Sequence, residues 1–457
     1  MELRIYGYFF NNELHEFDEL IWCFAQITLI LHLLLLTIAP EMTKILFINT
    51  SERVGGAAIA AGRLMHALRH HVSARMLVRD RQTDHLSVST IRSSWLLTLK
   101  FLWERLVIFL NNGWNRHQVF AVDIANMGTD ITKMKEFNHA DIIHLHWVNQ
   151  GFLSLRNLEA ILRSGKQIVI TMHDMWYFTG ICHHAGTCTK YETGCDHCPF
   201  LARPFLGYDL AKRVFQKKKT VYQQASITFV GCSEWITHLA QRSALTQGHR
   251  VVSIPNPIDT DTFAPTDKAE ARRACQLPTD RHLILFTSRR ITDEMKGFQY
   301  LAEASRLIHS QHPEAAKKIA IVVVGLESDQ MKEQVDLDVY NVDYVENEAK
   351  MIQLYNAVDL FVTPSLQENL PNTIMEAMSC GTPCVGFHIG GIPEMIDHQQ
   401  NGYVADYRNA QDFADGILWA LDSDRYDTLS QAARQKVLTC YSEQQVVKRF
   451  LELYEKP

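Results

Sequence analysis

The sequence predicts an α/β protein with two domains, each built around a parallel sheet that is covered by helices on both faces. Short uncharged runs rich in β-forming residues alternate with helical stretches, as expected of strands that are buried on both sides. The alternation begins at residue 44 and restarts near residue 282. The stretch between the two series, SIPNPIDTDTFAP (253–265), holds three prolines and little periodicity, which is typical of a linker. The domain break is therefore expected near residue 255.

The expected elements follow the chain in order. Domain boundaries are predicted at 42–255 and 256–440, with a C-terminal helix in 441–457 that can pack back on the first domain. The predicted strands of the first half are 44–50, 74–78, 141–147, 167–173 and 226–232. Those of the second half are 282–288, 320–325, 358–364 and 382–387, with helices at 297–310, 348–357, 371–380 and 411–421. Because open α/β sheets bind ligands at the carboxyl ends of their strands, we expect functional residues in the loops that follow the strands, facing a cleft between the domains.

Composition narrows the classes of protein and partner. The chain has 457 residues, of which 47% are hydrophobic and 21% charged, and its formal net charge is −6. A negative chain of this size is a poor general binder of nucleic acid, because phosphate binding needs a basic surface. Most of the ten cysteines are isolated along the chain. This usage favours a reducing compartment, and we expect a cytoplasmic protein, with the inner face of the plasma membrane as an alternative location.

The segment that precedes Met42 allows three interpretations. Residues 20–39 carry no Asp, Glu, Lys or Arg and are about long enough to span a bilayer. However, Gln26, Thr28 and His32 interrupt the run, and an acidic stretch precedes it. Because Met42 leads directly into a first buried strand, residues 1–41 also fit a non-native translation extension. A membrane anchor and an ordinary helix are the other two interpretations.

The most informative segment of the second half lies between a buried strand and a helix. It carries Glu368 in the loop and Glu376 within the helix, and Leu370, Pro371 and Asn372 lie where the helix begins. Helix N-termini bind phosphate through free N–H groups, and carboxylates accept hydrogen bonds from sugar hydroxyls. The segment therefore predicts a site for a ligand that contains both phosphate and sugar.

Cations lie just after an earlier strand of the same half. Arg289 and Arg290 follow the predicted strand HLILFTS (282–288), and Lys296 and Gly297 come shortly after them. Two cations beside a strand end would neutralise a diphosphate, and arginine can do so through two parallel hydrogen bonds.

These motifs together resemble the family 4 retaining glycosyltransferases, which have two Rossmann-like domains facing a cleft (the GT-B fold). The likeness rests on the two glutamates, on the helix sequence EAMSCGTP (376–383), and on Gly390, Gly391 and Glu394. The resemblance implies that Glu368 contacts the transferred sugar and Glu376 the ribose. It also implies that Lys296 and an arginine, Arg290 in preference to Arg289, hold the donor phosphates without a catalytic metal. The linker departs from the family pattern at Pro257, where glycine is usual.

The first half supplies a glycine pair and strand-end histidines. Gly55 and Gly56 follow the first strand and open a helix, where backbone N–H groups can approach a diphosphate or an acceptor hydroxyl. His173 ends the strand QIVITM, and the resemblance implies that it contacts the transferred sugar near the reacting carbon. For His144 and His146, a structural and a functional interpretation are both open.

A dense cysteine group follows His173. It consists of Cys182, Cys188, Cys195 and Cys198, whose four thiolates could hold a structural zinc ion. Disulfides and unliganded cysteines are the alternatives. The stretch resembles a subset of family 4 enzymes of bacterial exopolysaccharide synthesis, similar to the colanic-acid transferases.

One predicted helix is apolar around most of its circumference. Residues 95–110 read WLLTLKFLWERLVIFL. Burial in the core is the default expectation for such a helix, and peripheral membrane contact is the second.

The function expected from the sequence is transfer of a sugar, with retention of anomeric configuration, from a nucleotide diphosphate sugar. The acceptor would be a saccharide or lipid-linked saccharide in polysaccharide biosynthesis. A nucleotide-sugar 2-epimerase on the same fold is one alternative, and a non-catalytic assembly protein is another.

Overall fold

The computed structural model describes residue 26 and residues 42–91, 94–116, 118–202 and 209–455 of the chain. The contacts divide the chain into two units, Met1–Thr43 and Lys44–Pro457, and the second unit holds both sheets. Within the described ranges, no helix is both long enough and apolar enough to cross a membrane. The expectations for residues 1–41 fall almost entirely outside these ranges.

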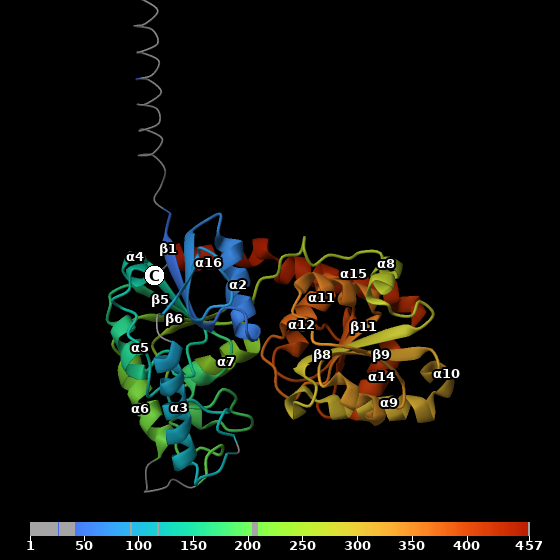
Figure 1. Cartoon of the computed structure of the whole chain (residues 1–457), viewed down its shortest axis with the longest axis horizontal. Coiled ribbons are helices and arrows are strands. Elements are labelled where there is room, and N and C mark those ends of the chain that lie inside the picture. The colour runs from blue at the N-terminus through green and yellow to red at the C-terminus, as the bar shows by residue number, and fades with distance from the viewer. Residues whose placement is uncertain (1–25, 27–41, 92–93, 117, 203–208, 456–457) are drawn as a thin grey trace, which may run out of the picture. The chain divides into compact units, whose positions relative to one another are not determined.

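The first half forms a seven-stranded sheet in the order β3-β2-β1-β4-β5-β6-β7, in which every neighbouring pair is parallel. Its strands are β1 (Lys44–Ser51), β2 (Ser73–Asp80), β3 (Val88–Thr90), β4 (Ile142–Leu145), β5 (Gln167–Met172), β6 (Ile227–Gly231) and β7 (Arg250–Ser253). Its helices are α2 (Gly56–Leu68), α3 (Ser94–Asn111), α4 (Lys135–His139), α5 (Leu155–Leu162), α6 (Leu210–Tyr222) and α7 (Glu234–Arg242). Figure 1 shows these elements from blue to green.

The second half repeats the arrangement with a six-stranded parallel sheet in the order β10-β9-β8-β11-β12-β13. Its strands are β8 (His282–Arg290), β9 (Ile319–Leu326), β10 (Asp338–Val342), β11 (Leu360–Thr363), β12 (Cys384–Phe387) and β13 (Gly402–Ala405). Its helices are α8 (Lys268–Cys275), α9 (Phe298–Gln311), α10 (Pro313–Ala316), α11 (Glu348–Ala357), α12 (Asn372–Ser379), α13 (Ile392–Met395), α14 (Ala410–Ala420) and α15 (Ser423–Cys440), and the chain then continues into α16 (Glu443–Glu455). The predicted fold class, α/β with two doubly wound parallel sheets, is confirmed.

Both sheets are buried on two faces, and the strand sequences show why. Successive side chains of a strand point to opposite faces. Along β1, Ile45 and Phe47 join one core, whereas Leu46 and Ile48 join the core on the other face. Uncharged side chains at every position are therefore required, which explains the continuous apolar runs.

The C-terminal helix α16 packs in the first half. Val446 and Phe450 of α16 share a core with Ile45 and Leu64, and α16 contacts α2. The same two helices are labelled near β1 in Figure 1.

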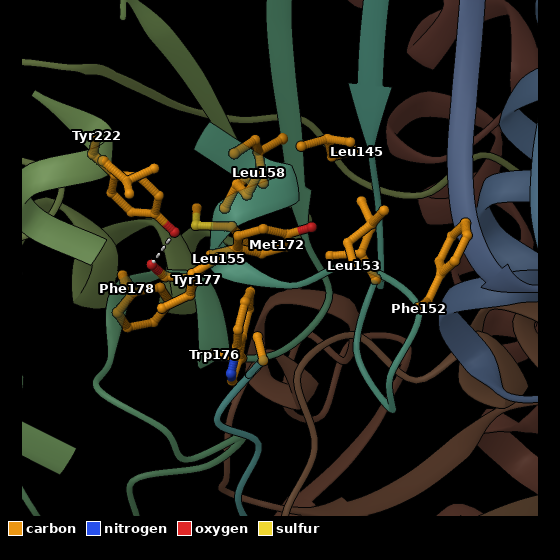
Figure 2. Close-up of a cluster of buried hydrophobic side chains, with 14 of the residues drawn as sticks. Leu145, Phe152, Leu153, Leu155, Leu158, Met172, Trp176, Tyr177, Phe178 and Tyr222 are labelled. Atoms are coloured by element: carbon orange, nitrogen blue, oxygen red, sulfur yellow. Dashed lines mark hydrogen bonds between the residues drawn. The ribbon is translucent and has the colours of Figure 1, made fainter. Parts of the chain in front are cut away.

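The segment that follows β5 is held by a cluster of buried aromatic side chains (Figure 2). Trp176, Tyr177 and Phe178 are each no more than 2% exposed. The Tyr222 hydroxyl donates a hydrogen bond to the Tyr177 carbonyl at 3.0 Å. Lys218 donates to the Trp176 carbonyl at 2.5 Å, and burial lowers its pKa to about 7. These contacts fix the chain just beyond His173.

The expectation that residues 95–110 form a buried core helix is wrong for one face. In α3, Leu97 and Ile108 are buried, but a whole face of large apolar side chains is 42–64% exposed: Trp95, Leu96, Leu99, Leu102, Trp103 and Leu106. A helix that packs on a sheet buries only one side, and nothing in the described part of the chain covers the other.

Candidate active site at the ends of the strands

The strand order reverses between β8 and β11 in the second sheet, the position at which open α/β sheets bind ligands. The loop after β8 ends in a short helix, Glu294–Lys296, followed by Gly297 with a φ of 73°. A Cβ at Gly297 would lie 1.8 Å from the Pro364 carbonyl oxygen, so only glycine allows the two loops to touch. The Leu366 amide also donates to the Met295 carbonyl at 2.9 Å.

This contact brings Lys296 to Glu368. The Lys296 Nζ lies 2.7 Å from Glu368 Oε1, and the two side chains are 37% and 16% exposed. The charge of Glu368 raises the pKa of Lys296, with the charge of Asp293 also contributing, against the opposing effect of burial. A lysine has three donor hydrogens, so Lys296 can hold an anion while it remains paired with Glu368.

Arg289 and Arg290 are the last residues of β8, and both are exposed. The strand pairing is irregular between Thr287 and Arg290, near the end of β8. Neither guanidinium takes part in an ion pair within the described ranges, so both are available to a ligand.

Asn369, to which the sequence assigned no role, ties the loop between β11 and α12 to the first half. Its Nδ2 donates to the His173 carbonyl at 3.0 Å, and its Oδ1 accepts from the Ser233 hydroxyl at 2.5 Å. Gly390 and Gly391 close around the same loop, since a Cβ on either would lie within 2.2 Å of a backbone oxygen of Glu368 or Asn369. Glycine is therefore needed at both positions so that this turn can lie against the backbone of Glu368 and Asn369.

Glu394 lies in α13, as expected, and it also caps a helix of the other half. Its carboxylate accepts hydrogen bonds from the backbone N–H groups of Glu234 and Trp235 at 2.7 and 2.6 Å. These are the first residues of α7, where a helix carries partial positive charge. Burial raises the pKa of Glu394 despite these hydrogen bonds.

The start of α12 faces the glycine turn of the first half. Leu370 and Pro371 are buried, and Asn372 Nδ2 donates to the Gly56 carbonyl at 3.2 Å. Gly55 has a φ of 94°, and both Gly55 and Gly56 are exposed. Two segments that the sequence indicated separately therefore meet.

Glu376, on the second turn of α12, has two partners that the sequence did not indicate. Arg63 Nη2 lies 2.8 Å from its Oε1, and the Tyr355 hydroxyl donates to its Oε2 at 2.8 Å. Arg63 also pairs with Glu348 at 3.3 Å, and its Nη1 is buried with no hydrogen-bond partner among the described residues. Arg63 lies on α2 beyond Gly56, but sequence spacing cannot reveal a partner from the other half of the chain.

The three strand-end histidines of the first half differ in their surroundings. His144 is fully buried between the Tyr454 hydroxyl at 2.9 Å and the Thr171 hydroxyl at 2.7 Å, which makes it a structural residue. His146 Nδ1 lies 2.9 Å from His173 Nε2. Burial lowers the pKa of His173 to about 4, so this imidazole is neutral at neutral pH.

Next to His173, Asp174 holds a second cluster. Its carboxylate accepts hydrogen bonds from His183 Nδ1 and from the Trp147 indole, both at 2.8 Å. Burial alone would raise the pKa of Asp174, but the charge and hydrogen bond of His183 outweigh it and lower the pKa to about 2. Burial likewise opposes the charged form of His183, but Asp174 raises its pKa. The pairing of His183 with Asp174 was not predicted, because His183 lies within the cysteine group, next to Cys182.

The four cysteines line one small pocket together with Ile181, Ala185, Lys190, Tyr191, Asp196, Pro199, Phe200 and Ala211. All four are free thiols, and burial raises the pKa of Cys182 to about 12 and that of Cys195 to about 11. Across the described residues, no group of three or more His, Cys, Asp or Glu side chains is placed to hold a metal ion. The arrangement therefore does not support the zinc site or the disulfides.

Comparison with known proteins gives a family match for part of the chain. Residues 281–423 match the family described as glycosyl transferases group 1. A D-inositol 3-phosphate glycosyltransferase of Thermobispora bispora is 27% identical over 195 residues, which cover 40% of this chain and 45% of that protein. D-inositol 3-phosphate glycosyltransferase 2 of Catenulispora acidiphila is 29% identical over 184 residues, which cover 38% of this chain and 43% of that protein. The chain thus spans less than half the length of these relatives.

Solved structures share the fold over most of the chain. Sucrose-phosphate synthase from Thermosynechococcus elongatus superposes with a TM-score of 0.64 at 18% identity, covering 91% of this chain and 98% of that one. Anabaena HepE in complex with UDP-glucose superposes with a TM-score of 0.58 at 16% identity, and the superposition covers 90% of this chain and 99% of that one. Residues 281–423 thus match the glycosyl transferases group 1 family, and the chain shares the two-domain fold of these solved structures.

Proposed function

We propose that the chain is a retaining glycosyltransferase that moves a sugar from a nucleotide diphosphate sugar to a hydroxyl of a saccharide or lipid-linked saccharide. The observation that carries the proposal is the Lys296–Glu368 ion pair, which lies where the strand order of the second sheet reverses. Asn369 joins the same loop to the backbone of His173. A cation for phosphate, a carboxylate for sugar hydroxyls and a neutral imidazole are thereby within one connected set of loops.

In the proposed reaction, the bond between the sugar C1 and the phosphate oxygen breaks, and the acceptor oxygen bonds to C1 on the same face. The acceptor proton passes to the departing phosphate oxygen, so charge and atoms balance. Arg290 and Lys296 stabilise the negative charge that develops on the diphosphate. Glu368 and His173 hold the sugar, and Glu376 holds the ribose.

The Gly55-Gly56 turn would contribute backbone N–H groups next to the diphosphate, because it meets Asn372 at the start of α12. Leu370 and Pro371 shape the entry to that helix. Assignment to family 4 and a role in polysaccharide synthesis belong to the same proposal and rest on the sequence motifs. None of these roles requires a catalytic metal.

The test is a donor screen on the full chain with UDP-, GDP- and dTDP-sugars, starting with UDP-glucose because HepE has been crystallised with it. Release of nucleotide diphosphate is measured with and without acceptors, including saccharides and D-inositol 3-phosphate, which the relatives' name suggests. We expect release that an acceptor accelerates, and a product with the donor's anomeric configuration by NMR. An epimerised sugar without acceptor would replace the proposal with the 2-epimerase, and donor binding without any turnover would indicate an assembly protein.

A further inference from the structure

We propose that the exposed face of α3 is a membrane-docking surface that binds an anionic lipid bilayer in the plane of its headgroups. The face consists of Trp95, Leu96, Leu99, Leu102, Trp103 and Leu106, whose side chains are 42–64% exposed. The proposal is independent of the donor site, which lies on the other half of the chain.

The helix geometry separates two faces of α3. At about 100° per residue, the six exposed residues fall within roughly one third of the helix circumference. The opposite side carries Leu97, Glu104, Arg105 and Ile108, all of them buried. The exposed face is therefore a continuous apolar stripe along the helix and does not result from scattered surface residues.

One further aromatic residue extends the stripe beyond the helix. Trp114 is 62% exposed and contacts Phe109 of α3 edge-on, with the ring centroids 5.7 Å apart. Tryptophan is enriched at membrane–water interfaces, where its ring has an apolar body and a polar N–H.

The charges near the stripe favour an anionic lipid surface as the occupant. The only acidic residue of α3, Glu104, is fully buried, so the stripe presents no negative charge of its own. Arg116 is exposed just beyond Trp114. The stripe is thus neutral to basic on a chain whose net charge is −6.

A basic helix, α6, lies in the same half of the chain as α3. Asn112, just after α3, accepts a hydrogen bond from the Ala202 amide at 2.6 Å, and α6 is the next helix along the chain from Ala202. Lys212, Arg213 and Lys217 are exposed on α6. Basic side chains beside an inserted apolar face add attraction to anionic headgroups.

The contacts of α3 connect the stripe to the candidate active site. A Cβ at Gly151 would lie 2.8 Å from the Phe101 amide nitrogen, so the helix backbone rests directly on the loop that follows β4. The same loop contains Trp147, whose indole contacts Asp174. Docking through α3 would hold this edge of the sheet near the bilayer, where a lipid-linked acceptor would present its sugar. This benefit rests on the proposed function, whereas the docking itself does not.

The experiment is flotation of the full chain with mixed vesicles of phosphatidylcholine and phosphatidylglycerol, and with pure phosphatidylcholine vesicles. We expect binding to the anionic vesicles, weakened by salt, together with a blue shift of tryptophan fluorescence. The variant Leu99→Glu/Leu102→Glu places charge in the centre of the stripe and should reduce the partition coefficient at least tenfold. Leu86→Glu is the matched control: Leu86 is 92% exposed outside α3, and this variant should bind as the wild type does.

Other occupants give different outcomes. If residues 1–41 anchor the chain by themselves, wild type and double variant will float equally, which overturns the proposal. If a second copy covers the stripe, sedimentation will show a dimer that the double variant dissociates, with no vesicle binding, and the proposal fails in this case too. A monomer that binds no vesicles overturns it as well. Thermal unfolding, followed by circular dichroism, checks that the variants are folded.

Discussion

Replacing Lys296 with alanine tests whether this lysine stabilises the diphosphate that departs in the proposed reaction. One Lys296 hydrogen is donated to Glu368 at 2.7 Å, which leaves two for phosphate oxygens. Loss of one preorganised donor to developing charge costs about 3 kcal/mol, roughly a hundredfold in turnover or more. The variant also leaves Glu368 without its cation in a site where it is 16% exposed, and repulsion of the diphosphate will add to the loss.

The assay is kcat and KM for the donor identified in the screen, with thermal unfolding to confirm the fold. The matched control is Lys317→Ala, which removes a lysine–glutamate pair of the same 2.7 Å length whose side chains are 70% and 83% exposed. This surface pair lies away from the carboxyl ends of the strands, so turnover should not change. The double variant Lys296→Ala/Glu368→Gln separates the lost cation from the freed carboxylate. A folded Lys296→Ala enzyme within fivefold of wild-type turnover would refute the phosphate role.

Three further predictions concern residues to which the sequence assigned no role. Arg63→Ala should raise the donor KM about tenfold and change kcat little, because Arg63 orients the Glu376 carboxylate, which is proposed to hold the ribose. The control is Arg281→Ala, which breaks an ion pair of 2.7 Å at the amino-terminal end of β8 and should leave KM unchanged. Asp174→Asn should cost about 2 kcal/mol of unfolding free energy at neutral pH, since the Asp174 pKa is about 2 in the fold against 3.8 in the reference state. A lowered acid pKa stabilises the fold above the unfolded pKa, so the difference from wild type should vanish as the pH falls through about 2, and denaturant titrations at several pH values measure it. His183 acts in the opposite direction: its raised pKa stabilises the fold below pH 6.5, and this part should disappear as the pH rises above the folded pKa.

The strands that the sequence predicted are those buried on both faces. β1, β5, β8 and β9 each contain a continuous apolar run, because the middle of a central strand in a parallel sheet is buried on both faces. The strands that it missed, β3, β7, β10 and β13, are the outermost strands of the two sheets. An edge strand has one neighbour and partial exposure, so its sequence carries no such run.

The sequence by itself determined the two-domain α/β fold, because the fold depends on the local order of strand, turn and helix. The residues proposed to hold phosphate and sugar were also chosen from this local order. It could not determine which residues of one half meet those of the other. The Arg63–Glu376 pair joins α2 to α12, and the Asn369–His173 contact joins the loop after β11 to the end of β5. It also could not decide which side of α3 is covered, because an apolar helix gives no sign of which face meets the core. Those features depend on packing between distant segments, and the tertiary structure alone decided them.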